Sequence, residues 1–272
     1  MDRLDALFRH FQISAELFHA GALCGINDFE ARPGQGQLHL VRRGPLAVEH
    51  RAPHAPLTID APALLLYPRP LFHRFVSDPV DGADLVCAQV LFADAEVHPL
   101  ALALPAVVHL PLAGLPPQST AVLETLFEEA FVQRCGRQTL LNRLFEVVLI
   151  QLLRELLARG TVQPGLLAGL ADRHLAPLLV ALHEDPARAW DLPSMAAVAL
   201  MSRSRFAAHF HAVVGTTPAD YLLQWRRLRV RHLQQQKGMR LKQIAPLVGY
   251  GSGAALARAL RSVKDEIQRR VP

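Results

Sequence analysis

Two cysteines and two histidines in the N-terminal half have side chains that could carry sensing or metal chemistry. Cys24 precedes the segments that hold His39 and His73, and Cys87 follows them. Two thiols that meet can form a reversible disulfide. With two imidazoles nearby, they can instead bind a soft metal such as zinc or copper. The third alternative is that both thiols are buried and inert, which is common for cysteine.

Basic side chains in the C-terminal part could bind phosphate. Residues 171–272 hold 16 Lys and Arg against 7 Asp and Glu, a balance of +9, whereas residues 1–170 have a balance of −4. A basic module beside a mildly acidic body favours binding to a polyanion. The alternative is a solvated, arginine-rich surface.

The elements that would carry these basic residues are helices. Residues 191–215 have the pattern of a helix-turn-helix, in which Ser202 caps the second helix. The pattern returns at 241–261, where Ser252 is the corresponding cap. One long basic helix, 216–236, is predicted between the two units.

These paired units resemble the DNA-binding domain of the AraC/XylS family of bacterial transcription regulators. The matching residues are Trp190, Leu192, Met195, Ala196, Met201–Ser204, Phe206, Phe210, Gly215, Pro218, Tyr221, Leu222, Trp225, Arg226, Leu228, Leu233, Ile244, Ala245, Val248–Tyr250, Ser252 and Arg258. The resemblance implies double-stranded DNA as partner, with two recognition helices in successive major-groove segments on one face.

The resemblance also assigns residues to the DNA. The reading faces of the two recognition helices would be Arg203, Ser204, Ala207 and Ala208 in the first, and Gly253, Ala254, Ala257 and Arg258 in the second. Arg258 is the best candidate for direct readout, because arginine pairs bidentately with guanine. Arg203, Arg205 and Lys242 are expected to hold phosphates.

Several positions depart from the family pattern, among them Ala207 and Ala208, where the family often has Arg or Gln. Leu200 stands at the first turn, where the family usually has Gly, and a positive φ there would strain it by about 1 kcal/mol or more. Pro246 stands inside the first helix of the second unit, where proline opposes helix continuation.

Residues 36–95 read as short strands separated by turn signals, which favours a small barrel or sandwich. Residues 37–76 resemble the cupin-type sensor domain of one AraC subgroup, through Leu38–Val41 and Gly44, then Leu64–Pro68 and His73. Metal cupins have more histidines in these motifs. His39 and His73 are therefore weak metal candidates, and we expect no enzyme and no cofactor.

Some members of that subgroup sense oxidants through cysteines placed like Cys24 and Cys87, so the resemblance implies these two as sensor thiols. A regulator that senses a small molecule and has inert cysteines is the alternative. A metal-dependent cupin enzyme with a DNA-binding tail is a third.

The sequence predicts an α+β chain in four parts. These are a cupin-like β-barrel (1–117), an amphipathic helical segment (118–160), a linker (161–170) and an all-α double helix-turn-helix domain (171–272). The helical segment could form a dimer seam or simply cover one face of the barrel. We expect a cytoplasmic homodimer with no membrane contact, with an unknown effector or oxidant and RNA polymerase as further partners.

Overall fold

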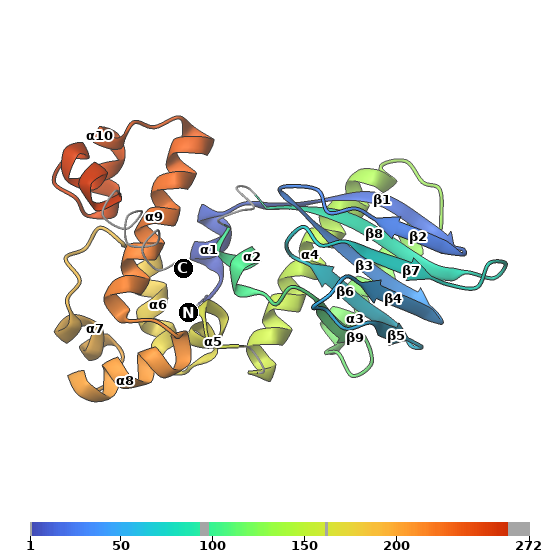
Figure 1. Ribbon diagram of the computed structural model, residues 1–272, viewed down its shortest axis with the longest axis horizontal. Coiled ribbons are helices and arrows are strands. Elements are labelled where there is room, and N and C mark those ends of the chain that lie inside the picture. Colours follow the sequence, from blue (N-terminus) through green and yellow to red (C-terminus); the bar gives the residue numbers. More distant parts are fainter. Residues whose placement is uncertain (1, 93–97, 161–162, 261–272) are drawn as a thin grey trace. The chain divides into compact units, whose positions relative to one another are not determined.

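The computed structural model describes residues 2–92, 98–160 and 163–260 of the chain. It divides into two compact units (Figure 1). One is Gln12–Leu156, and the other combines Met1–Phe11 with Leu157–Pro272. The first unit consists of sheets with flanking helices and the second of helices, so the predicted α+β class is confirmed.

The strands of the Gln12–Leu156 unit form two antiparallel sheets. The five-stranded sheet has the order β1 (Ile13–Leu23), β8 (Ala83–Phe92), β3 (Gln35–Arg43), β6 (Ala63–Tyr67) and β9 (Val108–Pro111). The four-stranded sheet has the order β2 (Ile26–Phe29), β7 (His73–Val76), β4 (Leu46–His50) and β5 (Leu57–Ile59). Since no described strand joins the two sheets, the expected barrel is a two-sheet sandwich.

Side-chain alternation explains which faces of the strands are covered. In β4, Leu46 and Val48 are buried and Glu49 is exposed, as expected for a strand with one solvated face. β6 is buried along its whole length, because its sheet is covered on both faces.

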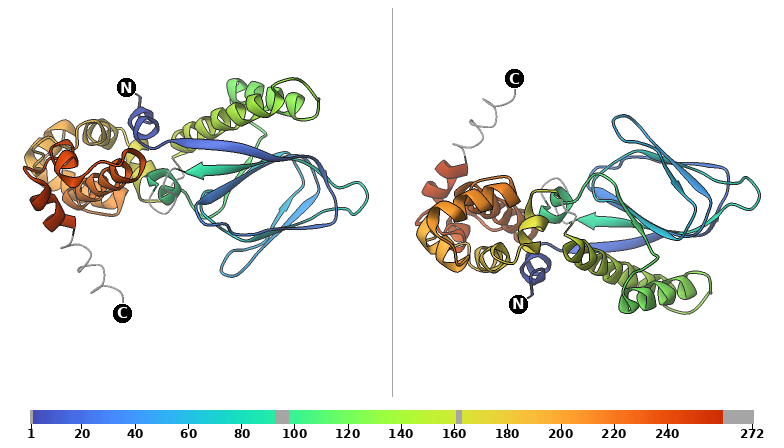
Figure 2. Two further views of the ribbon diagram at one scale, coloured as in Figure 1. Left: turned by 90° about the horizontal axis from the view of Figure 1, so that it is seen from above. Right: turned by 90° about the horizontal axis from the view of Figure 1, so that it is seen from below.

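Three helices belong to this unit: α2 (Pro99–Ala103), α3 (Pro117–Ala130) and α4 (Arg137–Arg159). Figure 2 shows α3 and α4 along one side of the sandwich. The start of α4 is tied to the edge strand β1, where the Leu17 amide donates to Asn142 Oδ1 at 2.9 Å and Gln138 Nε2 donates to the Leu17 carbonyl at 3.0 Å. The helical segment predicted at 118–160 thus consists of α3 and α4.

The second unit is helical throughout its described part. Its helices are α1 (Asp5–His10), α5 (Leu166–Ala171), α6 (Leu175–Glu184), α7 (Leu192–Val198), α8 (Arg203–Val214), α9 (Pro218–Lys237), α10 (Leu241–Ile244), the 3-10 helix η1 (Ala245–Val248) and helical residues 253–260.

Two predicted boundaries need correction. Residues 166–170 were expected to be linker, but they are helical, and Leu167 and Leu170 are buried in the helical unit. The barrel was expected to begin at residue 1, but residues up to Phe11 belong to the helical unit. Residues 161–162 lie outside the described part.

A chain of aromatic contacts holds the helical unit together. Phe210 of α8 meets Tyr221 of α9 at 5.7 Å between ring centroids. The Tyr221 hydroxyl is 2.6 Å from His183 Nε2, and the His183 ring stacks on Trp225 at 3.8 Å. Trp225 in turn meets Phe11 edge-on at 5.3 Å. Burial lowers the pKa of His183 to about 3, so this histidine is neutral and acts as a packing group.

Candidate functional site

The two predicted helix-turn-helix units repeat one local geometry. Leu200 and Gly249 both adopt the left-handed conformation, with φ of 55° and 80°. The next amide in each turn donates back to the small residue where the helices cross: Met201 N–H to the Ala196 carbonyl at 3.0 Å, and Tyr250 N–H to the Ala245 carbonyl at 2.9 Å. Leu200 therefore has the positive φ that would strain a residue other than glycine.

The second unit differs from the first in two ways. In the second unit, Gly251 adds one residue between the turn residue and the N-cap. The caps Ser202 and Ser252 are therefore one residue further apart in the sequence than the turn residues Leu200 and Gly249. Pro246 ends α10 early, and residues 245–248 continue as a 3-10 helix. Ser252 Oγ accepts from the Ala255 amide at 3.1 Å, whereas the Ser202 side chain makes no such bond.

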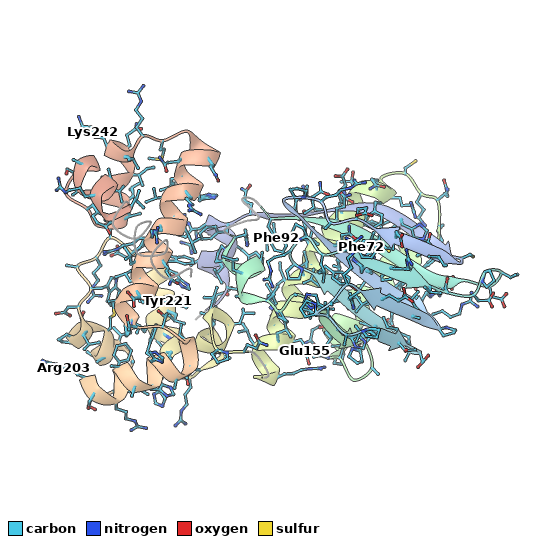
Figure 3. The ribbon with its side chains drawn as sticks, viewed as in Figure 1. Phe72, Phe92, Glu155, Arg203, Tyr221 and Lys242 are labelled. Carbon is cyan, nitrogen blue, oxygen red and sulfur yellow. The ribbon has the colours of Figure 1, made fainter. Side chains whose placement is uncertain are left out.

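Most predicted contact residues are accessible. Arg203, Ser204, Arg205 and Ala208 are exposed at the start of α8, and Lys242, Ala254 and Arg258 are exposed in the second unit. Figure 3 shows Arg203 and Lys242 at opposite ends of the helical unit, with Tyr221 between them. Ala207 and Ala257 are half-buried.

Gly253 is the exception among the predicted reading residues. A Cβ at this position would lie 3.0 Å from the Lys242 nitrogen and 3.1 Å from its Cα. Gly253 therefore faces α10, and the glycine lets the second recognition helix approach the α10 backbone closely. This packing favours a structural role for Gly253, and its place on the reading face stays a prediction.

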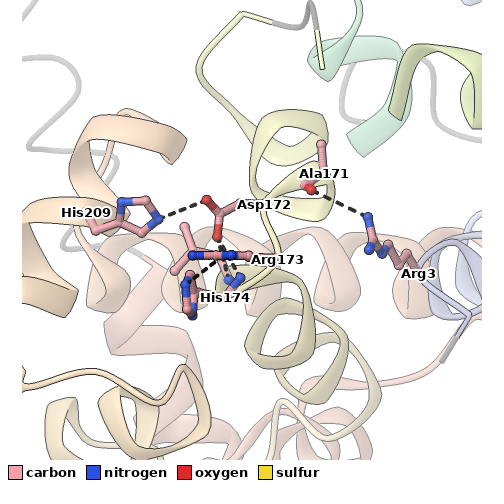
Figure 4. Close-up of polar contacts among 7 residues, drawn as sticks. Arg3, Ala171, Asp172, Arg173, His174 and His209 are labelled. Carbon is pink, nitrogen blue, oxygen red and sulfur yellow. Dashed lines mark hydrogen bonds and ion pairs between the residues drawn. The ribbon is translucent and has the colours of Figure 1, made fainter. Parts of the chain in front are cut away.

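A clamp at the base of α8 was not predicted from the sequence. Asp172 Oδ2 pairs with His209 Nε2 at 2.9 Å, and Asp172 Oδ1 accepts from the His174 and Leu175 amides at 2.8 and 2.9 Å (Figure 4). Burial acts to raise the pKa of Asp172, but these hydrogen bonds and His209 outweigh it and lower the pKa. The only sequence signal for this role was an aspartate just before a helix.

Arg3 makes a second contact near this clamp. Its Nη1 donates to the Leu170 carbonyl at 3.0 Å and to that of Ala171 at 3.5 Å (Figure 4). The C-terminal end of α5 is therefore held by a residue from the start of the chain.

The sandwich interior brings His39 and His73 together. Their Nε2 atoms are 3.0 Å apart, and His73 Nδ1 is 3.0 Å from the Leu71 carbonyl. That carbonyl assigns the His73 proton to Nδ1, so His39 donates from Nε2 and keeps an unprotonated, buried Nδ1. Tyr67 stacks on the His73 ring at 3.9 Å. Burial lowers the pKa of His73 to about 4 and that of His39 well below 6.5, so both rings are neutral.

This pair does not extend into a metal site within the described part of the chain. No group of three or more His, Cys, Asp or Glu side chains there could hold a metal ion. The two imidazoles are instead hydrogen-bonded to each other inside an aromatic core.

Cys24 and Cys87 are not brought together. Cys87 lies opposite His19 in the β1–β8 register, whereas Leu23, next to Cys24, pairs with Ala83. Four strand positions correspond to about 13 Å, and a disulfide needs Cα atoms within about 7 Å. Cys24 is exposed, while Cys87 is buried and burial raises the pKa of its thiol. Of the alternatives given for these two thiols, a direct disulfide between them does not fit this register.

Among the helices of the described segments, none is both long enough and apolar enough to cross a membrane.

Comparison with known proteins covers both units. A cupin family model matches residues 2–158, and a helix-turn-helix domain model matches residues 195–266. An AraC-like transcription regulator from Streptomyces lividans is 38% identical over 163 residues, which cover 59% of this chain and 53% of that protein. One from Streptomyces antibioticus is 40% identical over 164 residues, covering 59% and 54%. The alignments thus span about half of the length of these relatives.

Solved structures give a weaker similarity. ToxT from Vibrio cholerae O395 aligns over 93% of this chain and 94% of its own, with 10% identity and a TM-score of 0.37. A score this low supports no conclusion about function.

Proposed function

We propose that this chain, which belongs to the cupin family through residues 2–158 and matches a helix-turn-helix domain at residues 195–266, is a sequence-specific DNA-binding transcription regulator of the AraC/XylS type whose cupin domain senses an effector. The observation that carries this proposal is the repeated turn geometry at Leu200 and Gly249. Each turn is followed by a helix that starts with exposed residues, as in recognition helices of this motif.

The two recognition helices have different roles. Arg258 is an exposed arginine on the second helix and would read a base through a bidentate pair with guanine. Arg203, Arg205 and Lys242 would hold phosphates, which position the protein without reading sequence. Ala208 and Ala254 offer only apolar contact, for example to a thymine methyl group.

The effector is a small molecule rather than an oxidant in this proposal. Cys87 is buried with a raised thiol pKa, and thiolate character is what makes a cysteine react. Cys24 is exposed, and the β1–β8 register keeps Cys87 out of its reach.

The proposed regulator is a homodimer, which would recruit RNA polymerase at its promoters. Leu140 and Val147 are exposed on the outer face of α4, and Leu144 between them is half-buried. Apolar side chains on the exposed face of a helix suit a helix–helix contact. In sedimentation velocity, the full chain should be a dimer that Leu140→Glu dissociates.

The decisive experiment selects duplexes bound by the full chain from a random library and measures affinity against salt. We expect a consensus sequence, and a slope of log K against log salt of about −4 to −5 if about five phosphates are neutralised. The double variant Arg203→Ala/Arg258→Ala should lose this preference. The control, Arg154→Ala, removes an exposed arginine of the cupin unit and should keep it. Absence of enrichment at low salt would refute the proposal.

A further inference from the structure

The two helix-turn-helix units are packed on opposite ends of one helix, α9. In the first unit, Phe210 of α8 meets Tyr221 near the start of α9. The core of the second unit holds α10 and η1 against Val230 and Leu233, towards the end of α9. Figure 1 shows this order, with α8 at one end of α9 and α10 at the other. From Tyr221 to Val230 the helix rises about 14 Å, and a bend within this length would change how the two units face each other.

Arg226 lies on α9 between the two cores and is half-buried. Its Nε donates to the Pro186 carbonyl at 2.8 Å, and its Nη2 donates to the Arg188 carbonyl at 3.2 Å. Both carbonyls belong to the loop 185–190, which leads into α7, the first helix of the first unit. The planar guanidinium, with its rigid fork of donors, therefore holds this loop against α9 through two bonds.

The loop that accepts these bonds is ordered by contacts of its own. Asp185 Oδ1 accepts from the Arg188 amide at 3.1 Å, and the Trp190 indole donates to the Asp185 carbonyl at 2.9 Å. The Trp190 amide donates to the Arg188 carbonyl at 2.8 Å, and Asp191 then caps α7. Because the loop is fixed within itself, the bonds from Arg226 also fix the place where α7 begins.

The turn of the second unit meets the same loop. A Cβ at Gly249 would lie 2.8 Å from the Ala187 carbonyl oxygen and 2.8 Å from Arg226 Nη2, so only glycine lets the turn come this close. The ring of the next residue, Tyr250, has its centroid 5.8 Å from the guanidinium carbon of Arg226, within cation–π range. We call this meeting point the Arg226 joint, formed by residues 185–190, Arg226 and residues 249–250.

We propose that Arg226 is a positioning residue that holds the second helix-turn-helix unit against the first, and thereby restricts binding to one spacing between two DNA boxes. A box is the short segment read by one recognition helix, and this proposal rests on the proposed function. One added base pair moves the second box by about 3.4 Å along the DNA axis and about 35° around it. Units held by both α9 and the joint cannot follow that change, whereas units held by α9 alone can.

The first measurement tests the joint without DNA. Spin labels are attached to the full chain at Ala208→Cys and Ala254→Cys, two exposed positions on the two recognition helices. Cys24→Ser and Cys135→Ser remove the exposed native thiols. Pulsed electron paramagnetic resonance then measures the distance between the labels. With Arg226 in place we expect one narrow distance distribution.

Two variants of α9 are compared in this background. Arg226→Met keeps an apolar stem but has no donor for the two carbonyls, so it should broaden the distance distribution. The matched control, Arg231→Met, removes an exposed arginine of the same helix outside the joint and should leave the distribution narrow. A distribution that is equally narrow, or equally broad, with and without Arg226 would overturn the proposal.

The second measurement varies the number of base pairs between the two boxes, in a chain without labels. The wild type should bind its best spacing at least about tenfold more tightly than spacings changed by one base pair. Arg226→Met should reduce this ratio below about threefold and should bind a duplex with a single box as the wild type does. Arg231→Met should keep the wild-type ratio.

Arg226→Lys distinguishes positioning from charge, and it covers the case in which Arg226→Met does not fold. Lysine keeps the positive charge, but its ammonium cannot reproduce the planar fork to two carbonyls. It should therefore also lose the preference for one spacing. If lysine instead keeps the wild-type ratio, or if Arg226→Met reduces the salt slope by about 1, Arg226 acts as a charge on DNA and the proposal is overturned.

The two measurements separate this proposal from the proposed function. If the chain selects no DNA sequence, the proposed function fails, and with it the role of the joint in spacing, while the label distances still decide whether Arg226 holds the units together. If the chain binds its boxes but Arg226→Met keeps the wild-type spacing ratio, or weakens all duplexes alike, only the proposal for Arg226 fails.

Discussion

Replacing Gly253 by alanine tests whether the second recognition helix is positioned by backbone packing. The new Cβ would lie 3.0 Å from the Lys242 nitrogen, 3.1 Å from its Cα and 3.3 Å from the Leu241 carbonyl carbon. All three are backbone atoms, which cannot move aside as the end of a flexible side chain can. The helix would have to move away from α10 by a few tenths of an ångström.

Two opposing effects set the magnitude. Overpacking of this kind costs about 1–3 kcal/mol. Alanine is favoured over glycine by about 1 kcal/mol in a helix interior. That gain is smaller here, because Gly253 is the first residue of its helix. The net loss should be about 1–2 kcal/mol, which lowers the protection of the amides in this unit about five- to thirtyfold.

Hydrogen exchange on the full chain, resolved over residues 241–260, measures this loss. Gly251→Ala is the control, because a Cβ there meets nothing within 4 Å. Its effect should stay within about 0.5 kcal/mol. If Gly253→Ala kept normal protection and yet lost specific DNA binding, Gly253 would face the DNA and the packing argument would be refuted.

Three further predictions concern other residues. Arg258→Ala should relax preference at one base position and cost about 1–3 kcal/mol, whereas Lys242→Ala should weaken all duplexes alike, as competition binding on specific and random DNA will show. Leu200 is 85% exposed at φ 55°, so Leu200→Asn should relieve backbone strain and raise the free energy of unfolding by about 0.5–1 kcal/mol in denaturant titrations. Since the pKa of His73 falls to about 4 on folding, the unfolded chain binds this proton first, and the melting temperature should fall as pH drops from about 6.5 to about 4. His73→Phe should make that slope shallower, and an unchanged slope would assign it to other groups.

Local features of the helical unit were predictable from the sequence. The turn at Leu200 and the side-chain cap at Ser252 follow from residue type and spacing within a few positions, whereas Ser202 takes the N-cap position without the predicted side-chain bond. The early end of α10 at Pro246 also follows, because proline lacks the N–H that a continuing helix needs.

Features that depend on distant partners were not predictable in the same way. The sequence placed Gly253 on the reading face. It could not show that the backbone of Leu241 and Lys242 in α10 lies close to this glycine. The pairing of Cys24 with Cys87 looked plausible until the β1–β8 register fixed their separation. The sequence also did not indicate that Trp225 would pack against Phe11.

Residues up to Phe11 pack in the helical unit, and this affects the order in which the two units can fold during synthesis. Phe11 leaves the ribosome about 200 residues before its partner Trp225, a delay of roughly 10 to 40 seconds. The residues of the sandwich are contiguous and all emerge within that interval. The sandwich can therefore fold first, while the helical unit waits for both ends of its chain. A ribosome that stops early releases a sandwich without a finished helical unit, and no nascent chain can complete its helical unit before its sandwich has been synthesised.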